Sequence, residues 1–298
     1  MKRNQESGIA KFFGKPIVFV PMIIVIHLSL MILLAPLFSS LIRLIPDNEP
    51  EAAEIKGCSE SAECFKYGMI LHQAREYDRA AELLEKGCEM DNSLSCEVRG
   101  DLEYRKQVRN ASPAAAEKFY ARGCQLSNRM ACHNEAKVIS ENFPDRKGAP
   151  EQLLTLWKKA CDLGIPQSCA ETGKMLFEQN DFAGAAKYAH QGCYVGITEG
   201  CVYETAAARR TGAAAPDIKK RRTLLIACEK NNIPLACYEY ALTLPKKSQE
   251  EVSAALPFLD KACAASKKQE FCNEARKMRY VLSLPWQPVK KTPERGRQ

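Results

Sequence analysis

Residues 124–132, CQLSNRMAC, hold two cysteines eight positions apart, and this unit recurs along the chain. The chain has 298 residues and 14 cysteines, which fall into seven sequential pairs. These are Cys58/Cys64, Cys88/Cys96, Cys124/Cys132, Cys161/Cys169, Cys193/Cys201, Cys228/Cys237 and Cys263/Cys272. From the second pair onward, the first members lie 36, 37, 32, 35 and 35 residues apart. A period near 35 residues indicates an array of structural repeats.

The spacing within a pair predicts where the chain must turn. The separation is eight residues four times, nine twice and six once. Two residues eight apart on one helix are separated by about 12 Å of rise, whereas the Cα atoms of a disulfide lie about 4.4–6.8 Å apart. If the pairs are bonded, each one therefore joins the last turn of one helix to the first turn of the next. Zinc ligation and buried thiols are alternatives, but no CxxC motif of the kind that zinc sites favour is present.

The net charge of +7 is concentrated at the two ends of the chain. Residues 1–15 and residues 284–298 each carry four basic and one acidic side chain, which gives +3 for each segment. The body between them is therefore close to neutral. A nucleic-acid-binding protein needs a basic stripe on its folded body, so this charge distribution argues against that class of function.

The N-terminal region has the pattern of a membrane anchor. A basic tail, residues 1–15, precedes a predicted transmembrane segment, residues 16–45, whose core from Ile17 to Ala35 carries no charge. Nineteen helical residues span about 28 Å, close to the thickness of a bilayer core. The positive-inside rule places the N-terminus in the cytoplasm. We expect a single-pass signal anchor in a bacterial inner membrane with the remainder periplasmic; a cleaved signal peptide is the alternative. Residues 46–57 then form a linker.

Residues 58–283 show helical periodicity throughout. Amphipathic segments such as Tyr77–Cys88 and Phe182–Cys193 end at the first cysteine of a pair. In the first six pairs, the position four residues after the second cysteine usually holds a small residue. The residues at this position are Gly68, Gly100, Ala136, Gly173, Thr205 and Ala241. Small residues at a fixed phase allow paired helices to stack closely. In the last unit this place is Arg276, as expected for a capping helix. Residues 284–298 are predicted to be a disordered basic tail.

These motifs resemble the Sel-one-like repeat, a relative of the tetratricopeptide repeat. The match includes Ala80, Lys86, Gly87, Cys88 and Cys96, and again Ala160, Cys161, Leu163, Gly164, Cys169 and Gly173. The branch with paired cysteines is the Helicobacter cysteine-rich protein family. The resemblance covers about residues 58–283 and implies a solenoid of disulfide-stapled antiparallel helix pairs. Members of that family are described as penicillin-binding or weakly beta-lactam-hydrolysing, so it also implies an enzymatic alternative.

The sequence contains no recognised catalytic motif. No serine is followed three positions later by lysine, as serine beta-lactamases require. No Gly-x-Ser-x-Gly, His-Glu-x-x-His or P-loop is present. We therefore predict no catalytic residues, no cofactor and no metal site. A weak beta-lactam-binding enzyme and a redox or metallochaperone assembly factor remain as alternatives.

Binding of a protein or peptide is the favoured function. Stacked helix pairs present a concave surface lined by one helix of each pair. Carrying over the tetratricopeptide phase places eight side chains on that surface: Asp101, Tyr104, His133, Lys137, Lys174, Phe177, Arg209 and Tyr238. Aromatic and basic side chains suit a peptide or an acidic partner segment. The sequence thus predicts a membrane-anchored periplasmic scaffold or adaptor for another protein of the cell envelope. For any one of these side chains taken alone, the alternative interpretation as an ordinary exposed helix residue is favoured.

Overall fold

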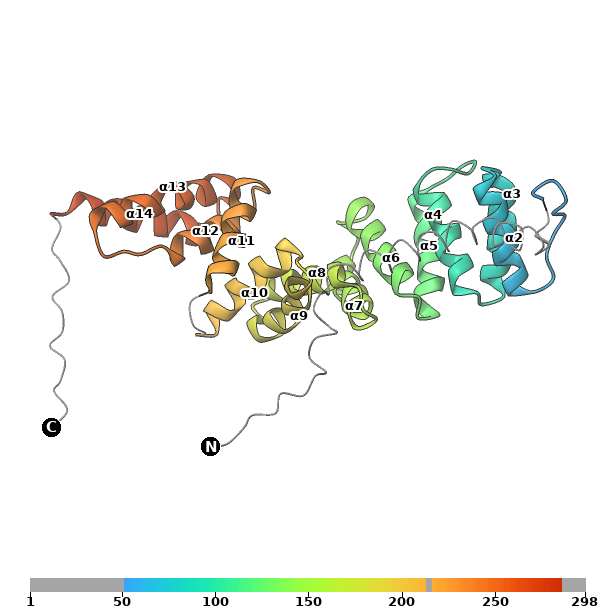
Figure 1. Cartoon of the computed structure of the whole chain (residues 1–298), viewed down its shortest axis with the longest axis horizontal. Helices are drawn as coiled ribbons and strands as arrows, with labels where there is room; N and C mark the ends of the chain where they lie inside the picture. The colour runs from blue at the N-terminus through green and yellow to red at the C-terminus, as the bar shows by residue number, and fades with distance from the viewer. Residues whose placement is uncertain (1–50, 213–215, 286–298) are drawn as a thin grey trace, which may run out of the picture. The chain divides into compact units, whose positions relative to one another are not determined.

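The structure is a computed structural model that describes residues 51–212 and 216–285. The chain divides into two units, Met1–Glu54 and Ile55–Gln298. Within the described residues, thirteen α-helices and no strands are present (Figure 1). The helices are α2 (Ser61–Gln73), α3 (Tyr77–Glu89), α4 (Ser93–Tyr104), α5 (Pro113–Gln125), α6 (Arg129–Asn142), α7 (Ala149–Asp162), α8 (Pro166–Glu178), α9 (Phe182–Tyr194), α10 (Thr198–Arg210), α11 (Ile218–Glu229), α12 (Pro234–Thr243), α13 (Gln249–Ser266) and α14 (Gln269–Ser283). The predicted all-α class is confirmed for this part of the chain.

The predicted tail 1–15 and anchor 16–45 lie outside the described residues, as do residues 46–50 of the linker 46–57 and residues 286–298 of the tail 284–298. Across residues 51–212 and 216–285, no helix combines the length and the apolar character that membrane crossing requires. The anchor, its orientation and the periplasmic location therefore stay predictions.

A tight turn joins the two helices of a pair. In the second pair, Asp91 adopts a left-handed backbone with φ of 62°. Its N–H donates to the carbonyl of Cys88, and the Asn92 N–H donates to the carbonyl of Gly87. The Asn92 side chain then accepts from the Ser95 N–H and caps α4. Because only Met90, Asp91 and Asn92 separate the helices, cysteines eight residues apart meet at the corner.

All seven sequential pairs are disulfide-bonded, and their Cα–Cα distances run from 4.4 to 5.0 Å. Six bridges join the last turn of one helix to the first turn of the next, as the spacing predicted. The exception is Cys58, which precedes α2 and is bonded to Cys64 within it. This first bridge ties a coil to a helix because no helix ends at Cys58.

The last bridge differs from the others in its surroundings. Cys272 on α14 is bonded to Cys263 on α13, with a Cα–Cα distance of 4.7 Å. The second cysteine of every earlier pair is buried, whereas Cys272 is only half-buried. The physical reason is its place on α14, the last helix of the described residues, where no helix of a following repeat covers the corner.

Each helix packs against the next along the chain, and α4 also contacts α2 and α6. The small residues after the second cysteines make this packing close. A Cβ atom added at Gly100 would lie 2.7 Å from the ring of Tyr120 on α5, and one added at Gly173 would lie 2.6 Å from the Cβ of Ala189 on α9. Real Cβ atoms do not approach so closely, so both positions require glycine. Arg276 on the final helix is exposed, as the capping role predicted.

A second periodic contact ties repeats together. The residue two positions before the first cysteine, here called the strap position, is Lys86, Arg122, Lys159, Gln191, Ile226 and Lys261 in successive repeats. Lys159 Nζ donates to the carbonyl of Cys124 at 2.6 Å, and Lys261 Nζ donates to that of Cys228 at 2.7 Å. These carbonyls lie in the last turns of α5 and α11, where the helix dipole favours a cation. Ile226 has no group that could form such a bond.

Candidate functional site

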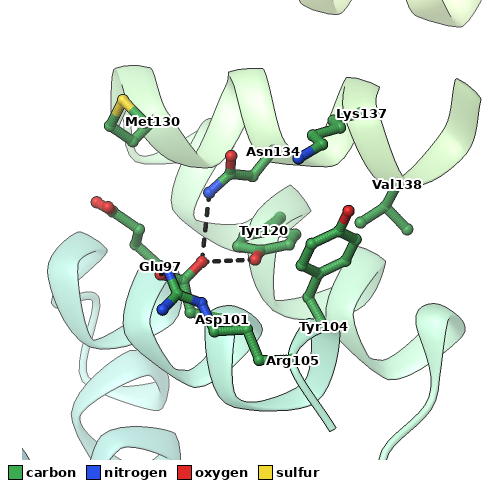
Figure 2. A pocket seen from close by; sticks show the side chains of 9 residues that line it. All are labelled: Glu97, Asp101, Tyr104, Arg105, Tyr120, Met130, Asn134, Lys137 and Val138. Atoms are coloured by element: carbon green, nitrogen blue, oxygen red, sulfur yellow. Dashed lines mark hydrogen bonds and ion pairs between the residues drawn. The ribbon is translucent and has the colours of Figure 1, made fainter. Parts of the chain in front are cut away.

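A cavity on the predicted binding face brings together three of the eight predicted side chains, Asp101, Tyr104 and Lys137 (Figure 2). It lies between α4 and α6, with one wall from α5. Nine residues line it: Glu97, Asp101, Tyr104, Arg105, Tyr120, Met130, Asn134, Lys137 and Val138. The contact between α4 and α6 in consecutive repeats makes this convergence possible.

Asp101 is the centre of a hydrogen-bonded group in the cavity (Figure 2). Its Oδ1 accepts from the Tyr120 hydroxyl at 2.6 Å and from Asn134 Nδ2 at 3.4 Å. Its Oδ2 lies 4.0 Å from the Arg105 guanidinium. Because these three partners come from different segments, the carboxylate has a fixed position and can orient a polar group of a bound segment.

Tyr104 and Lys137 form the opposite side of the cavity. The Tyr104 hydroxyl donates to Glu141 Oε2 at 2.6 Å, and the Lys137 ammonium lies 5.2 Å from the centre of the Tyr104 ring. A cation at this distance over an aromatic face is attracted by the ring. The pair therefore offers a flat aromatic surface with a positive charge beside it.

The charges in the cavity are separated rather than uniform. Burial raises the pKa of the Glu97 carboxyl, while Asn128, which donates to it, acts in the opposite direction. The bond to Glu141 and partial burial raise the pKa of the Tyr104 hydroxyl, and burial raises that of Tyr120. Both phenols are therefore neutral hydrogen-bond donors at physiological pH, and a ligand meets carboxylates on one side and ammonium on the other.

The cavity is small, with a volume of about 180 Å³. Sites for small organic ligands are typically about 300–1,000 Å³. A space of this size suits one inserted side chain of a partner, with the exposed helix surfaces on either side in contact with the rest of the segment. The geometry therefore fits recognition of a polypeptide better than that of a metabolite.

Three other predicted residues lie elsewhere and already have partners. His133 Nδ1 lies 2.9 Å from Ser168 Oγ, and its ring meets the edge of Trp157 at 5.1 Å. Burial lowers the pKa of His133. Lys174 is paired loosely with Glu171 at 3.7 Å. Arg209 forms a fork with the buried carboxylate of Glu239, with bonds of 2.6 and 2.7 Å.

The prediction that Phe177 and Tyr238 present accessible surface is wrong. Both are buried, with 8% and 5% of their surface exposed. Phe177 packs edge-on against Phe182 and Tyr203, and Tyr238 stacks on Phe271 at 4.4 Å. Each aromatic ring is covered by a helix of the following repeat. The prediction used only the position of a residue within its own repeat, so it could not include this contact between repeats.

Six of the nine residues that line the cavity were missed by sequence reasoning: Glu97, Arg105, Tyr120, Met130, Asn134 and Val138. Tyr120 belongs to α5, the helix that was expected to face away, yet its hydroxyl reaches Asp101. Asn134 follows Cys132 by two positions, one step out of the assumed phase. No motif marks Tyr120, whereas a wider helical window would have included Asn134.

The cysteines named as disulfide partners in the sequence all lie in the described part of the chain, and none of them is free. Cys272 is the one second cysteine of the described residues that is not buried. The bonded cysteines are Cys58, Cys64, Cys88, Cys96, Cys124, Cys132, Cys161, Cys169, Cys193, Cys201, Cys228, Cys237, Cys263 and Cys272. These bridges stabilise the structure locally, and no cysteine lines the cavity between α4 and α6.

No group of three metal-binding side chains is found within residues 51–212 and 216–285. His190 and Cys193 have a suggestive spacing, but Cys193 is bonded to Cys201 and has no thiolate to offer. The same holds for His133 beside Cys132, which is bonded to Cys124.

Comparison with known proteins gives likeness in solved structures only. No family model matches the sequence, and no curated protein matches it. A protective antigen of uropathogenic Escherichia coli with an SLR fold is 13% identical, with a TM-score of 0.48; the match covers 80% of this chain and 58% of that one. A Sel1 repeat protein from Oxalobacter formigenes is 12% identical, with a TM-score of 0.48, and the match covers 71% and 97%.

A tetratricopeptide repeat protein described as having an unusual peptide-binding site is 17% identical, with a TM-score of 0.43 over 66% of this chain and 99% of that one. The similar solved structures are thus Sel1 and tetratricopeptide repeat proteins. The chain's own geometry carries the assignment: helix pairs follow one another, and a bonded cysteine pair stands at each corner. The structure fits a cysteine-rich Sel-one-like repeat protein.

Proposed function

We propose that this chain is a scaffold or adaptor that binds a segment of a partner protein in the cavity between α4 and α6. The observation that carries the proposal is the convergence of Asp101, Tyr104 and Lys137 around a space of about 180 Å³. The partner inserts one side chain beside the Tyr104 ring. Backbone or other polar groups of the partner form hydrogen bonds with Asp101 and Asn134, and an acidic group of the partner pairs with Lys137.

We further propose that the chain is anchored in a bacterial inner membrane through residues 16–45, with the repeat array in the periplasm. Two observations support this location. The uncharged N-terminal segment follows a basic tail, and the seven disulfides are typical of a protein in an oxidising compartment. Protease protection in intact cells and in spheroplasts tests it. An array that is cleaved only after the cells are lysed would contradict a periplasmic location.

Site-specific photocrosslinking in intact cells tests the binding site. A photoreactive residue placed at Asn134, which lines the cavity, is expected to form one dominant adduct with a partner. The same residue at Lys118, which is exposed on α5, is the control position. Lys137→Glu should reduce the yield at Asn134, because it reverses the charge beside the Tyr104 ring. Equal adducts at both positions, or a yield that does not respond to Lys137→Glu, would overturn the proposal.

A further inference from the structure

A second surface, formed by α9 and α11, has the features of an independent binding site. Tyr194, at the end of α9, is 84% exposed and stands between two hollows. One hollow, of about 380 Å³, is lined by Pro166, Gln191 and Val195 among others. The other, of about 410 Å³, extends to Lys219, Thr223 and Ile226 on α11. His190 and Tyr194 line both, so the hollows form one continuous surface.

The strap position that lines the larger hollow is apolar. Where Lys159 and Lys261 reach back to a carbonyl of the preceding repeat, Ile226 leaves the space open and is itself 38% exposed. Val195, which lines the smaller hollow, is 55% exposed. Three large apolar side chains that remain exposed in the described part of the chain, those of Tyr194, Val195 and Ile226, thus line the two hollows, which is unusual for scattered surface residues.

The charges around Tyr194 are mostly positive. On α9, Lys187 lies on the same helix face as Tyr194, seven residues earlier, and on α11 Arg222 lies one turn from Lys219. Lys158 and Lys187 both approach the ring of Tyr188, at 5.7 and 5.6 Å. In the described part of the chain, no carboxylate comes within 4.0 Å of the ammonium groups of Lys158, Lys187 or Lys219.

Two carboxylates, of Glu204 and Asp217, also line the larger hollow. Glu204 Oε1 accepts from Lys220 Nζ and lies 2.9 Å from each of Lys220 Nζ and His190 Nδ1. Asp217 caps α11 by accepting from the Lys220 N–H. Asp217 keeps its negative charge, whereas the exposed cations of α9 and α11 that form no ion pair are Lys187, Lys219 and Arg222, and these three favour a negatively charged ligand.

We propose that this surface binds an acidic polypeptide segment with an apolar side chain, as a second docking site separate from the cavity between α4 and α6. The apolar side chain lies against Tyr194 in one of the hollows, and the carboxylates pair with Lys187, Lys219 and Arg222. Two concave hollows on either side of an aromatic ring fit side chains of a peptide, whereas a flat anionic bilayer would favour a convex surface. A site away from Asp101 lets the array hold two partners at once.

Fluorescence anisotropy of the full-length chain in detergent tests the proposal, with a fluorescein-labelled peptide of repeated Glu-Glu-Leu units as the probe. We expect saturable binding that weakens with added salt and no binding of a Lys-Lys-Leu peptide. Tyr194→Ser should weaken binding at least about tenfold, because an exposed tyrosine at the centre of a site is the kind of residue that dominates affinity. Lys219→Glu should weaken it as well.

Tyr280→Ser is the matched control, since Tyr280 is 66% exposed on α14 and should leave binding unchanged. Lys137→Glu separates this site from the cavity between α4 and α6. Loss of probe binding in Lys137→Glu with retention in Tyr194→Ser would overturn the proposal and place the probe in that cavity. Equal binding of both peptides would also overturn it, as would displacement of the probe by phosphatidylglycerol vesicles that bind the wild-type chain more tightly.

Discussion

The junction that Lys159 crosses and the junction that holds Ile226 occupy the same place in their repeats, yet they differ in structure. At the first, a charged hydrogen bond of 2.6 Å ties α7 to the end of α5. At the second, an apolar side chain lines an open hollow between α9 and α11. At these two junctions the strap position holds either a hydrogen bond to the preceding repeat or an apolar side chain that lines a hollow.

Removal of a disulfide should give the largest effect. Replacing Cys161 and Cys169 with alanine should cost about 2.5–3 kcal/mol on chain-entropy grounds. Because Lys159 ties α7 to α5, faster amide hydrogen exchange should extend into α5. The matched variant lacks Cys228 and Cys237. Its faster exchange should extend toward α13 through Lys261 and stop before α9. Uniform loss of protection over the whole array would contradict nearly additive repeats.

Gly173→Ala should destabilise the array by about 1–3 kcal/mol, because a Cβ there meets both the side chain and the backbone of Ala189. Gly57→Ala is the control, since an added Cβ at Gly57 meets no atom within 4 Å. Urea unfolding measures both. In the repeat beside the open hollow, the position equivalent to Gly173 is Thr205. This larger side chain is accommodated because α10 and α11 pack less extensively than α8 and α9. A neutral Gly173→Ala would remove this contrast.

Lys159→Met keeps the length of the side chain and removes the hydrogen bond to the Cys124 carbonyl. We expect a loss of about 1–2 kcal/mol in the free energy of unfolding. Lys158→Met, one residue earlier and exposed, serves as the control. If both variants unfold at the same urea concentration as the wild type, the strap contributes nothing to stability.

Glu135 makes stability depend on pH near the Lys159 junction. Burial and the neighbouring Glu117 raise the pKa of this carboxyl from 4.5 to about 7, while Gln152 and Lys159 oppose the shift. The unfolded chain loses the proton near pH 4.5 and the folded chain only near pH 7. The free energy of unfolding therefore falls as pH rises through this window and is flat above it.

Glu135→Gln should abolish this slope and raise stability above pH 7 by about 1–2 kcal/mol. Urea unfolding between pH 4 and 8 measures it, with exposed Glu82→Gln as the control that should keep the slope. A slope that persists in Glu135→Gln would assign it to other groups. Lys159→Met should steepen it, because it removes a cation that holds the pKa of Glu135 down.

Ile226→Lys should give the smallest effect and the most direct test of the comparison. A lysine here can reach the Cys193 carbonyl, as Lys159 reaches that of Cys124. We expect a gain of up to about 1 kcal/mol and slower amide exchange in α11. Ile226→Met is the control for the changed side-chain shape. If lysine and methionine have the same effect, the strap position does not determine how tightly this junction closes.

The repeat architecture was largely readable from the sequence because its cause is local. Cysteines eight residues apart require a turn, and the turn requires only a left-handed residue such as Asp91 followed by a capping Asn92. The binding surface was only partly readable. Asp101, Tyr104 and Lys137 followed the assumed phase, whereas Phe177 and Tyr238 are covered by the next repeat. Coverage depends on how far consecutive repeats overlap, and no residue within one repeat reports that.

The hollow beside Tyr194 also could not be predicted from the sequence. Ile226 visibly departs from the basic pattern at the strap position, but only the structure shows that this departure leaves open space. The space that a lysine side chain would occupy can be filled by a larger neighbouring side chain or can remain as a cavity. The outcome depends on the side chains of α9 and α11 together.

The short reach of the bridges also affects how the protein is made. The first cysteine of each pair is bonded to the next cysteine along the chain, six to nine residues away. A bridge can therefore close as soon as its own turn has left the ribosome or the translocation pore, before the following cysteine emerges. Because domains and repeats acquire structure in the order of synthesis, correct pairing follows from the order of emergence. Refolding of the complete reduced chain lacks that order, and it should be slower and more dependent on a disulfide isomerase than folding during synthesis.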